Sequence, residues 1–542
     1  MPDLRAHFPR SARLLFLLLL LPLALALSGQ AVAATFHVRV DGGDAVQCTG
    51  RADAPYSGSG SAQACAWKHP YYALPTSGSP RIAGGDTLII GPGDYMIGWG
   101  APGSSGGRCN TGARYDCYLA AVPSGPNANA RTRILGQSSR KGCLSPKFWG
   151  NERVEKIINL EGSSNVEVGC LEITDRSDCV EDHSNAAARC QRGTAPHGQW
   201  GAVGVSARNS GNVWLHDLNI HGLAHTGILA GGLVDWTLDR VKINGNGWVG
   251  WDGDIGSASS NSGRIVMRGV EIAWNGCGQR WQTGAYWACW AQQSGGYGDG
   301  LGTATTGGQW LIEDSHIHHN TSDGIDLLYL DGAPTSSATL LRVHAYANAG
   351  NQLKTRGNAT IENSVVVGQC SWFSGRDFMV SGDHCRALGN ALSFTLGANH
   401  VANIRHNTIT GEGDCLIVTS GGNATSRANI QNNAMIGQNE YGGGGSLTCG
   451  HYADGSAAVL AFQGNLFWNV KSNQCPGGSV CGQSPRLTNT TMANFNPNPM
   501  TGSPLIDRAP SVGVANDFYR GSRPVGPAPD IGAIEVRPSR TR

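Results

Sequence analysis

The chain has 542 residues with 78 Gly, 24 Pro and 16 Cys, and only 15% of its residues are charged. This composition excludes a coiled coil, a charged disordered protein and a compact helical bundle. The glycines are spread along the whole chain, and no Pro/Ser-rich or charged linker divides it, which favours one large domain.

Residues 1–33 have the pattern of a cleaved secretory signal peptide. Arg5, Arg10 and Arg13 precede a 14-residue apolar run, 14–27, and small residues follow at 31–33. The run is too short for a comfortable membrane span. We therefore expect a secreted protein, extracellular or periplasmic, without membrane insertion.

Once residues 1–33 are removed, 37 basic and 38 acidic side chains remain. This balance gives no electrostatic reason to expect a nucleic-acid partner. An acidic polymer can still bind through a local basic patch or a bridging cation. We expect the mature protein to be a monomer.

All 16 cysteines follow the signal segment, and an even number in an exported protein favours disulfides. Zinc binding is disfavoured because no Cys-x-x-Cys occurs. Spacing alone does not fix connectivity, but the cysteines fall into close sequential pairs: Cys48/Cys65, Cys109/Cys117, Cys143/Cys170, Cys179/Cys190, Cys277/Cys289, Cys370/Cys385, Cys415/Cys449 and Cys475/Cys481.

From about residue 150, short alternating strands recur, separated by Asn and Gly; examples are 218–220, 241–243, 316–318 and 343–345. Strands this short cannot bury a face alone, so they must stack on their neighbours. We expect an all-β fold, a single-stranded right-handed parallel β-helix with loop insertions, in which Asn and Gly form the corners. The alternative is a β-sandwich, which would place the strands in hairpins.

The predicted organisation has four parts. They are the signal peptide (1–33), an N-terminal cap with the first rungs (34–150), the parallel β-helix (151–470), and C-terminal rungs with a tail (471–542). The runs 84–95, 503–507 and 529–535 resemble the first rung and the ending of many exported β-helix proteins.

The largest interruption of the repeat lies between Trp274 and Gln309 and is rich in aromatic residues. Insertions in a solenoid form loops on one face, often the binding face. The rings either pack the loop onto the β-helix or stack on sugar rings. The candidates for sugar binding are Trp287, Trp290 and Tyr297.

Two aspartates recur at the spacing of one rung. Asp299 and Asp323 are 24 residues apart, and each precedes Gly and an apolar residue. Equivalent positions on successive rungs stack roughly 4.8 Å apart. The two carboxylates are therefore predicted to be neighbours.

A lysine follows one rung later. Aligning Ile325 with Leu353 places Lys354 over Asp326, and by the same register Asn351 lies over Asp323. If Ile325 points into the core, Asp326 points outward. We expect the three acids, Asn351 and Lys354 to converge on one outer patch.

Acids stacked this closely repel each other, which raises the pKa of one or attracts a cation. Arrays of carboxylate oxygens are what Ca²⁺ prefers. His318 lies on the same strand face as His316 and is a candidate for substrate binding, although polar residues on an outward face are common.

At these residues the sequence resembles the family-nine polysaccharide lyases, secreted parallel β-helix enzymes that cleave pectate and related uronic acid polymers. Their pattern is an Asp on one rung, Asp-Gly-x-Asp on the next and a later Lys, matched here by Asp299, by Asp323 with Asp326, and by Lys354. The resemblance implies that the acids hold Ca²⁺ and that Lys354 is the Brønsted base. The family often has two consecutive acids where this chain has Ser322-Asp323.

The implied reaction is β-elimination in a uronic-acid-containing, pectate-like polysaccharide. It removes the C5 proton and expels the oxygen at C4, and a cation on the carboxylate stabilises the developing charge. Arg356 is expected on the same side as Lys354, where it would bind another carboxylate. Two alternatives stay open: an inverting glycoside hydrolase that uses the Asp cluster, and a non-catalytic carbohydrate-binding β-helix.

Overall fold

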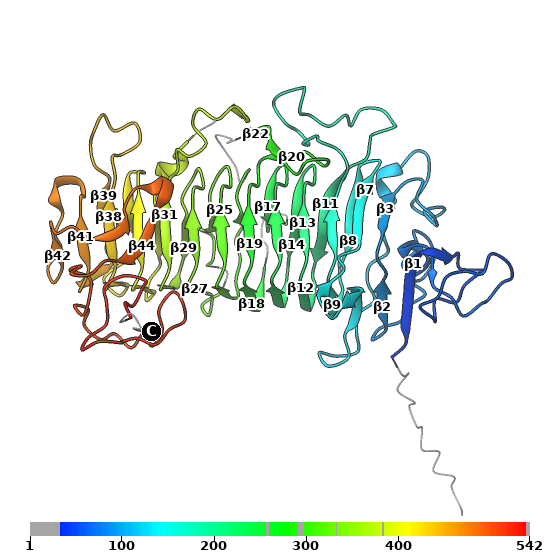
Figure 1. Ribbon diagram of the computed structural model, residues 1–542, viewed down its shortest axis with the longest axis horizontal. Helices are drawn as coiled ribbons and strands as arrows, with labels where there is room; N and C mark the ends of the chain where they lie inside the picture. Colours follow the sequence, from blue (N-terminus) through cyan, green and yellow to red (C-terminus); the bar gives the residue numbers. More distant parts are fainter. Residues whose placement is uncertain (1–32, 256–259, 291–296, 332, 382–383, 538–542) are drawn as a thin grey trace, which may run out of the picture. The chain divides into compact units, whose positions relative to one another are not determined.

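The computed structural model describes residues 33–255, 260–290, 297–331, 333–381 and 384–537. The predicted signal peptide lies outside these residues, apart from Ala33. In the unit formed by Ala34–Arg542, short strands stack side by side from β1 and β2 to β42 (Figure 1). They form three large sheets, in which all strand pairs are parallel.

Sheet 1 has 13 strands in the order β1 (Thr35–Gly43), β2 (Thr87–Ile90), β4 (Thr132–Gly136), β9 (Ser164–Gly169), β12 (Gly211–His216), β15 (Val234–Asp239), β18 (Ser262–Arg268), β24 (Gln309–Glu313), β27 (Ser337–Leu341), β30 (Asn358–Glu362), β34 (Val401–Arg405), β37 (Arg427–Gln431) and β40 (Val459–Gln463).

Sheet 2 also has 13 strands: β3 (Asp94–Gly98), β7 (Lys147–Asn151), β10 (Glu172–Thr174), β13 (Asn219–His221), β16 (Lys242–Asn244), β19 (Glu271–Ala273), β25 (His316–His318), β28 (His344–Tyr346), β31 (Val365–Gly368), β35 (Thr408–Gly411), β38 (Ala434–Gly437), β41 (Leu466–Trp468) and β42 (Val480–Cys481).

Sheet 3 has ten strands: β8 (Val154–Asn159), β11 (Gly201–Arg208), β14 (Thr226–Gly231), β17 (Val249–Asp252), β23 (Leu301–Gly302), β26 (Ile325–Leu327), β29 (Leu353–Arg356), β33 (Leu392–Leu396), β36 (Cys415–Gly421) and β39 (Cys449–Asp454).

The remaining elements are small. Four two-stranded sheets pair β5 (Ser138–Ser139) with β6 (Gly142–Cys143), β20 (Gly278–Gln279) with β21 (Tyr286–Trp287), β22 (Cys289–Trp290) with β32 (Met379–Ser381), and β43 (Leu487–Asn489) with β44 (Asn496–Pro499). The 3₁₀ turns are η1 (Pro70–Tyr72), η2 (Arg114–Asp116), η3 (Arg386–Gly389), η4 (Lys471–Asn473) and η5 (Met492–Asn494). Among the described residues, no helix is long and apolar enough to span a bilayer.

From β8 onward to β41, each rung visits sheet 3, then sheet 1, then sheet 2, as in β14, β15 and β16. Parallel strands joined by such crossovers wind right-handed. The prediction of a right-handed parallel β-helix is therefore confirmed, and a sandwich of hairpins is excluded. The parallel stack runs from Thr35 to Cys481, so it reaches beyond 151–470 at both ends.

Alternation along each strand separates the core from the surface. In β29, Leu353 and Thr355 are fully buried, whereas Lys354 and Arg356 point outward. The same pattern on every rung produces one continuous apolar core along the inside of the three sheets. Outward side chains of neighbouring strands consequently form straight rows.

A ladder of buried asparagines holds the corner between sheets 2 and 3. Asn246, Asn275, Asn320 and Asn348 are each fully buried, and the side-chain amides of the first three each donate to the side-chain oxygen of the next asparagine at 2.8–2.9 Å. The Asn348 amide donates to Gln352 Oε1 at 2.9 Å. Because every amide also bonds backbone groups, the ladder satisfies polar groups that would otherwise be buried without partners.

The long insertions gather at this same corner. Segments 175–200, 274–300, 369–391 and 438–448 all connect a strand of sheet 2 to the next strand of sheet 3, and their described residues project from one edge (Figure 1). All eight predicted cysteine pairs form disulfides. Three of them, Cys179–Cys190, Cys277–Cys289 and Cys370–Cys385, close these insertions on themselves.

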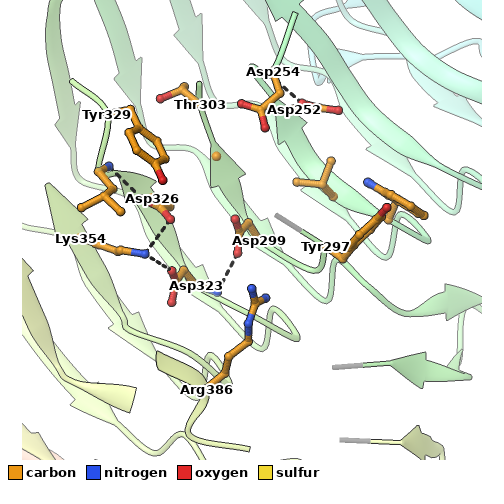
Figure 2. A pocket seen from close by; sticks show the side chains of 14 residues that line it. Asp252, Asp254, Tyr297, Asp299, Thr303, Asp323, Asp326, Tyr329, Lys354 and Arg386 are labelled. Atoms are coloured by element: carbon orange, nitrogen blue, oxygen red, sulfur yellow. Dashed lines mark hydrogen bonds and ion pairs between the residues drawn. The ribbon is translucent and has the colours of Figure 1, made fainter. Parts of the chain in front are cut away.

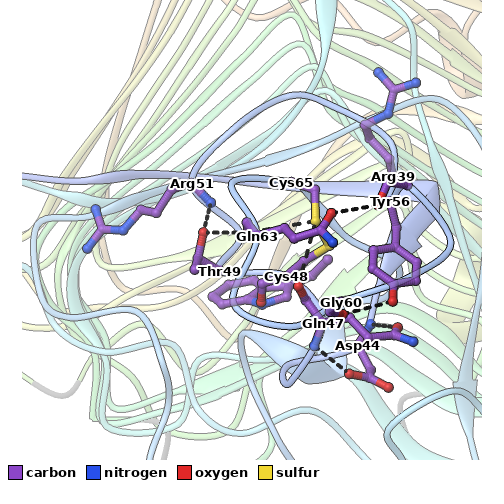
Figure 3. The surroundings of a disulfide bond; sticks show 12 residues. Arg39, Asp44, Gln47, Cys48, Thr49, Arg51, Tyr56, Gly60, Gln63 and Cys65 are labelled. Atoms are coloured by element: carbon purple, nitrogen blue, oxygen red, sulfur yellow. Dashed lines mark hydrogen bonds between the residues drawn. A yellow bond between two sulfur atoms is a disulfide. The ribbon is translucent and has the colours of Figure 1, made fainter.

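Another disulfide stabilises the N-terminal loop between β1 and β2. Cys48–Cys65 lies among backbone hydrogen bonds that tie Thr49 to Gln63 at 2.9 Å (Figure 3). The Trp67 indole donates to the Cys48 carbonyl at 2.9 Å beneath it. The loop, stabilised by this disulfide, lies at the first rung of the β-helix.

Candidate functional site

A cleft of about 560 Å³ opens on the outward face of sheet 3 (Figure 2). Strands β17, β23, β26 and β29 form its floor, and loops from the corner with sheet 2 form one wall. The lining residues are Trp248, Val249, Asp252, Asp254, Tyr297, Asp299, Gly302, Thr303, Asp323, Asp326, Leu328, Tyr329, Lys354 and Arg386.

The floor of the cleft is one outward row of side chains. Strand pairing places Asp252 beside Gly302, Gly302 beside Asp326, and Asp326 beside Lys354. The register of Ile325 with Leu353 is the one expected from the sequence. Lys354 therefore lies directly over Asp326.

Lys354 bridges two carboxylates. Its Nζ lies 2.8 Å from Asp326 Oδ2 and 3.0 Å from Asp323 Oδ2 (Figure 2). Burial alone would lower the pKa of the Lys354 ammonium, but the charges of Asp323 and Asp326 outweigh burial and raise it. Lys354 is thus a charged partner of both acids in this structure.

Asp299 and Asp323 occupy a different position from the one expected. They are 4% and 5% exposed, and they precede their strands at the corner rather than pointing outward. Asp299 Oδ1 accepts the Asp323 N–H at 2.9 Å, and Asp323 Oδ1 accepts the Asn351 N–H at 2.6 Å. Both residues still line the cleft together with Asp326 and Lys354, as expected, but the corner uses one oxygen of each carboxylate as a structural acceptor.

Asn351 extends the row of corner hydrogen bonds that runs from Asp299 through Asp323. Its amide donates to Asp323 Oδ1 at 3.0 Å, and its own Oδ1 accepts the backbone N–H of Asn390 at 3.2 Å. Asn351 is 2% exposed and does not line the cleft. Its role as a substrate-binding residue finds no support in this position.

The acids in the cleft are held in conditions that disfavour charge. Burial, with the charges of Asp323 and Asp326, raises the pKa of Asp299 well above its usual range. Burial, reinforced by Asp323 and opposed by Lys354, raises the pKa of Asp326 to about 6. Burial also raises the pKa of Asp252 to about 6. Burial is the largest cause of all three shifts, so these carboxyls lie in surroundings that favour their neutral form.

The lining contains five aspartates but only two basic residues, Lys354 and Arg386. Hard carboxylate oxygens in excess are the donor set that suits Ca²⁺. The oxygens of Asp299, Asp323 and Asp326 do not all lie within 4.8 Å of one another. The residues fit a calcium ion in chemistry and charge, provided that Lys354 leaves its place between Asp323 and Asp326.

Aromatic rings form one wall of the cleft. The Trp248 ring packs edge-on against Tyr297, with ring centroids 3.4 Å apart, and its other neighbour is His225, stacked at 4.6 Å. Tyr297 is the only one of the three predicted sugar-binding aromatics that lines the cleft. Flat rings in such a wall suit the apolar faces of sugars.

Arg386 enters the cleft from the 369–391 insertion. The disulfide Cys370–Cys385 ends one residue before it, and the Arg386 N–H donates to the Ala349 carbonyl at 3.0 Å. Its Nη1 donates to Ser322 Oγ at 2.6 Å, and Ser322 in turn hydrogen-bonds Asp299. Figure 2 shows the guanidinium extending toward the carboxylates. Arg386 is placed to bind an anionic group.

Four other predicted site residues lie outside the cleft. Arg356 points outward two residues after Lys354 but pairs with Asp331 at 2.9 Å. His318 is on sheet 2, stacked on Tyr346. Trp287 packs under the Arg280 guanidinium and Trp290 beside His183. Trp287 also donates to the Asp178 carbonyl at 3.0 Å, so these two aromatics pack their loop against the neighbouring insertions rather than lining the cleft.

Several cleft residues were missed from the sequence: Trp248, Asp252, Asp254, Tyr329 and Arg386. Asp252 precedes the Trp274–Gln309 interruption, so its rung is separated from that of Asp299 by the whole insertion. The repeat spacing alone therefore does not place the two rungs side by side. For Trp248 the usable signal is the clustering of tryptophans along the chain between Trp236 and Trp310.

No family model matches the chain, and no curated protein matches it. Among solved structures, the chain is similar to pectate lyase Pel9A, with 13% identity, a TM-score of 0.41, and coverage of 94% of this chain and 98% of that one. An alginate lyase from Paenibacillus sp. str. FPU-7 has 14% identity and a TM-score of 0.31, covering 72% and 93%. An endo-xylogalacturonan hydrolase from Aspergillus tubingensis has 9% identity and a TM-score of 0.32, covering 71% and 100%. These likenesses concern the fold and assign no activity to this chain.

Proposed function

We propose that the protein is a secreted polysaccharide lyase that cleaves a uronic-acid-containing polymer by β-elimination. The observation that carries the proposal is Lys354 held between Asp323 and Asp326 on the floor of an aromatic-walled cleft. A lysine can act as a base, and its neighbours control its protonation. Eight disulfides support the export of the protein.

In this proposal Lys354 removes the C5 proton of a uronate. It must first lose its own proton, and the two carboxylates that raise its pKa oppose that loss. Ca²⁺ held by Asp299, Asp323 and Asp326 would neutralise those carboxylates and stabilise negative charge on the uronate carboxylate. Arg386 binds and orients the same carboxylate from the wall of the cleft.

The polymer lies along the row of outward side chains. Trp248 and Tyr297 offer their rings to the apolar faces of the sugars, and the open cleft admits an extended chain. With five acids lining the cleft, a polyanion is repelled unless a cation is also bound. The proposal therefore includes Ca²⁺ as a required partner of this substrate.

One observation favours hydrolysis as a second candidate function. Asp252 and Asp326 lie in the same outward row two strands apart, which places them about 10 Å apart. This is close to the carboxyl separation of about 6.5–9.5 Å found in inverting glycoside hydrolases. In that case Asp326 and Asp252 serve as acid and base.

The experiment separates the two reactions by their products. The purified protein is incubated with a panel of uronic acid polymers, with Ca²⁺ or with a chelator. Elimination produces an unsaturated sugar that absorbs in the ultraviolet, whereas hydrolysis produces a reducing end without that absorbance. Unsaturated product that disappears with the chelator supports the lyase; reducing ends alone refute it.

A further inference from the structure

The cleft has two chemically different ends. Lys354 and Arg386 supply positive charge at one end. At the other end Asp252 and Asp254 form no ion pair with any described residue, and Asp252 Oδ1 accepts the backbone N–H of Asp254 at 2.8 Å. Three strand spacings separate Asp252 from Lys354, which is about 14 Å. A ligand that spans the cleft therefore meets both environments.

Thr303 provides an unsatisfied hydrogen-bonding group at the acidic end. The residue is 6% exposed and lines the cleft (Figure 2), yet no described residue forms a hydrogen bond with its buried Oγ1. Thr303 packs beside the backbone between Asp252 and Asp254, because a Cβ built on Gly253 would come within 2.7 Å of Thr303 Cγ2. Buried hydroxyls rarely lack partners, so this one points to a ligand.

Gly302 separates the two ends and leaves the floor open. It occupies the outward row between Asp252 and Asp326, where every other side chain would project into the cleft. A Cβ at this position would lie 2.9 Å from Asp299 Oδ2. The floor is therefore hollow beside the Asp252–Asp254 end, with the Trp248 and Tyr297 rings among the residues that line the cleft.

We propose that Asp252, Asp254 and Thr303 form a subsite for an uncharged sugar, so that the substrate is a heteropolysaccharide in which uronate residues are flanked by uncharged sugars. This inference rests on the proposed function for the position of the uronate. Carboxylate oxygens accept hydrogen bonds from sugar hydroxyls, and such charge-assisted bonds are strong; a threonine hydroxyl can both donate to and accept from them. A polymer that carries a carboxylate on every sugar would place one against Asp252.

Like charges in contact across an interface disfavour binding strongly. The acidic subsite therefore acts as a selective element against homopolymers of uronic acid. An alternating polymer avoids this repulsion while keeping its uronate at Lys354 and Arg386. The two ends of the cleft together select polymers in which charged and uncharged sugars alternate.

The test compares two classes of polymer by calorimetric binding in the Lys354→Arg background, in which elimination is expected to be about 100-fold slower or more. Polygalacturonate and polymannuronate carry a charge on every sugar; hyaluronan and the rhamnogalacturonan backbone alternate uronate with an uncharged sugar. We expect at least tenfold tighter binding of at least one alternating polymer. Tighter binding of both homopolymers would overturn the subsite.

Variants then test whether the preference for alternating polymers depends on Asp252, Asp254 and Thr303. Thr303→Val keeps the shape and removes no internal hydrogen bond, and it is expected to weaken alternating polymers about tenfold. Asp252→Asn with Asp254→Asn is expected to strengthen homopolymers and remove the preference. The matched control is Asp454→Asn, an exposed acid at the end of β39 on the same sheet, which should change neither.

Two outcomes contradict the subsite: an unchanged preference in all cleft variants, and loss of Ca²⁺ binding in the Asp252→Asn/Asp254→Asn variant, which would make these acids metal ligands. Failure of the proposed function has a different signature. It is the absence of unsaturated product from wild-type protein with every polymer, and it leaves the binding comparison intact.

Discussion

Lys354 Nζ lies 2.8 Å from Asp326 Oδ2, and the two residues are direct neighbours on adjacent strands of sheet 3. The pair is 28 residues apart in sequence and is held by the parallel register rather than by any local turn. The charge of Asp326 and that of Asp323 keep the pKa of the lysine high. Whether Lys354 can lose its ammonium proton therefore determines whether it can act as a base.

Lys354→Arg is expected to lower the rate of elimination about 100-fold or more while polymer binding is largely retained. Arginine stays protonated near neutral pH and can bind a carboxylate but cannot accept the C5 proton. The measurement is the initial rate of unsaturated product at saturating polymer. A variant with a rate near that of wild type would remove Lys354 from the mechanism.

Asp323→Asn and Asp323→Ala are expected to differ in their stability without Ca²⁺ but not in their loss of calcium binding. In the wild type, Asp323 Oδ1 accepts the Asn351 N–H at 2.6 Å. Asparagine keeps an acceptor oxygen there but removes the negative charge, whereas alanine removes the acceptor and the charge. Ca²⁺ should raise the melting temperature of wild type but not of either variant, because a ligand that binds only the folded state stabilises it. Without Ca²⁺, only Asp323→Ala should be destabilised, by about 1–3 kcal/mol. An equal calcium shift in all three proteins would refute the metal assignment.

Removing the Cys370–Cys385 disulfide by double alanine substitution is expected to raise KM more than it lowers kcat. The bond closes the loop that ends next to Arg386, which hydrogen-bonds Ser322 at 2.6 Å. Without the bond the arginine samples more positions, so substrate binding weakens. The control removes Cys475–Cys481, a disulfide outside the cleft lining. Equal kinetics in both variants would show that the loop does not position Arg386.

Asn320→Ala is expected to destabilise the fold by about 2–4 kcal/mol. The Asn320 amide donates to Asn348 Oδ1 at 2.8 Å and to the Ile272 carbonyl at 3.2 Å, and its own oxygen accepts from Asn275 at 2.8 Å. These partners are left buried without a bond. Denaturant unfolding measures the change, and the exposed Asn129→Ala serves as the control. Equal stability of the two variants would refute a structural role for the ladder.

Acid is expected to weaken the attachment of the C-terminal segment through Asp314. Burial raises the pKa of this carboxyl, but hydrogen bonds from Arg342 and Arg520 outweigh burial and lower it to about 2. A lowered folded pKa gives stability that is present above the unfolded value, near 3.8, and is lost as the pH falls toward 2. The stability difference between wild type and Asp314→Asn should therefore shrink between pH 4 and pH 2. A difference that stays constant over this interval would contradict the assignment.

The sequence by itself determined the β-helix and the register of Lys354 with Asp326, and it indicated the disulfide pairs without fixing them. Each of these follows from local or one-rung spacing: short strands must stack, sequential cysteines are close, and Ile325 aligned with Leu353 brings Lys354 to Asp326. Where the repeat is regular, residues that are one rung apart in sequence are neighbours on adjacent strands.

Tertiary structure alone decided which residues complete the cleft. Asp252 lies one strand from Gly302 although a long insertion separates them in sequence, because the insertion loops out at the corner and adds nothing to the stack. Arg386 reaches the acids from a disulfide-closed loop, and the same corner buries Asp299 and Asp323 as backbone acceptors. Loop paths and corner hydrogen bonds depend on packing between distant rungs, and no periodicity in the sequence encodes them.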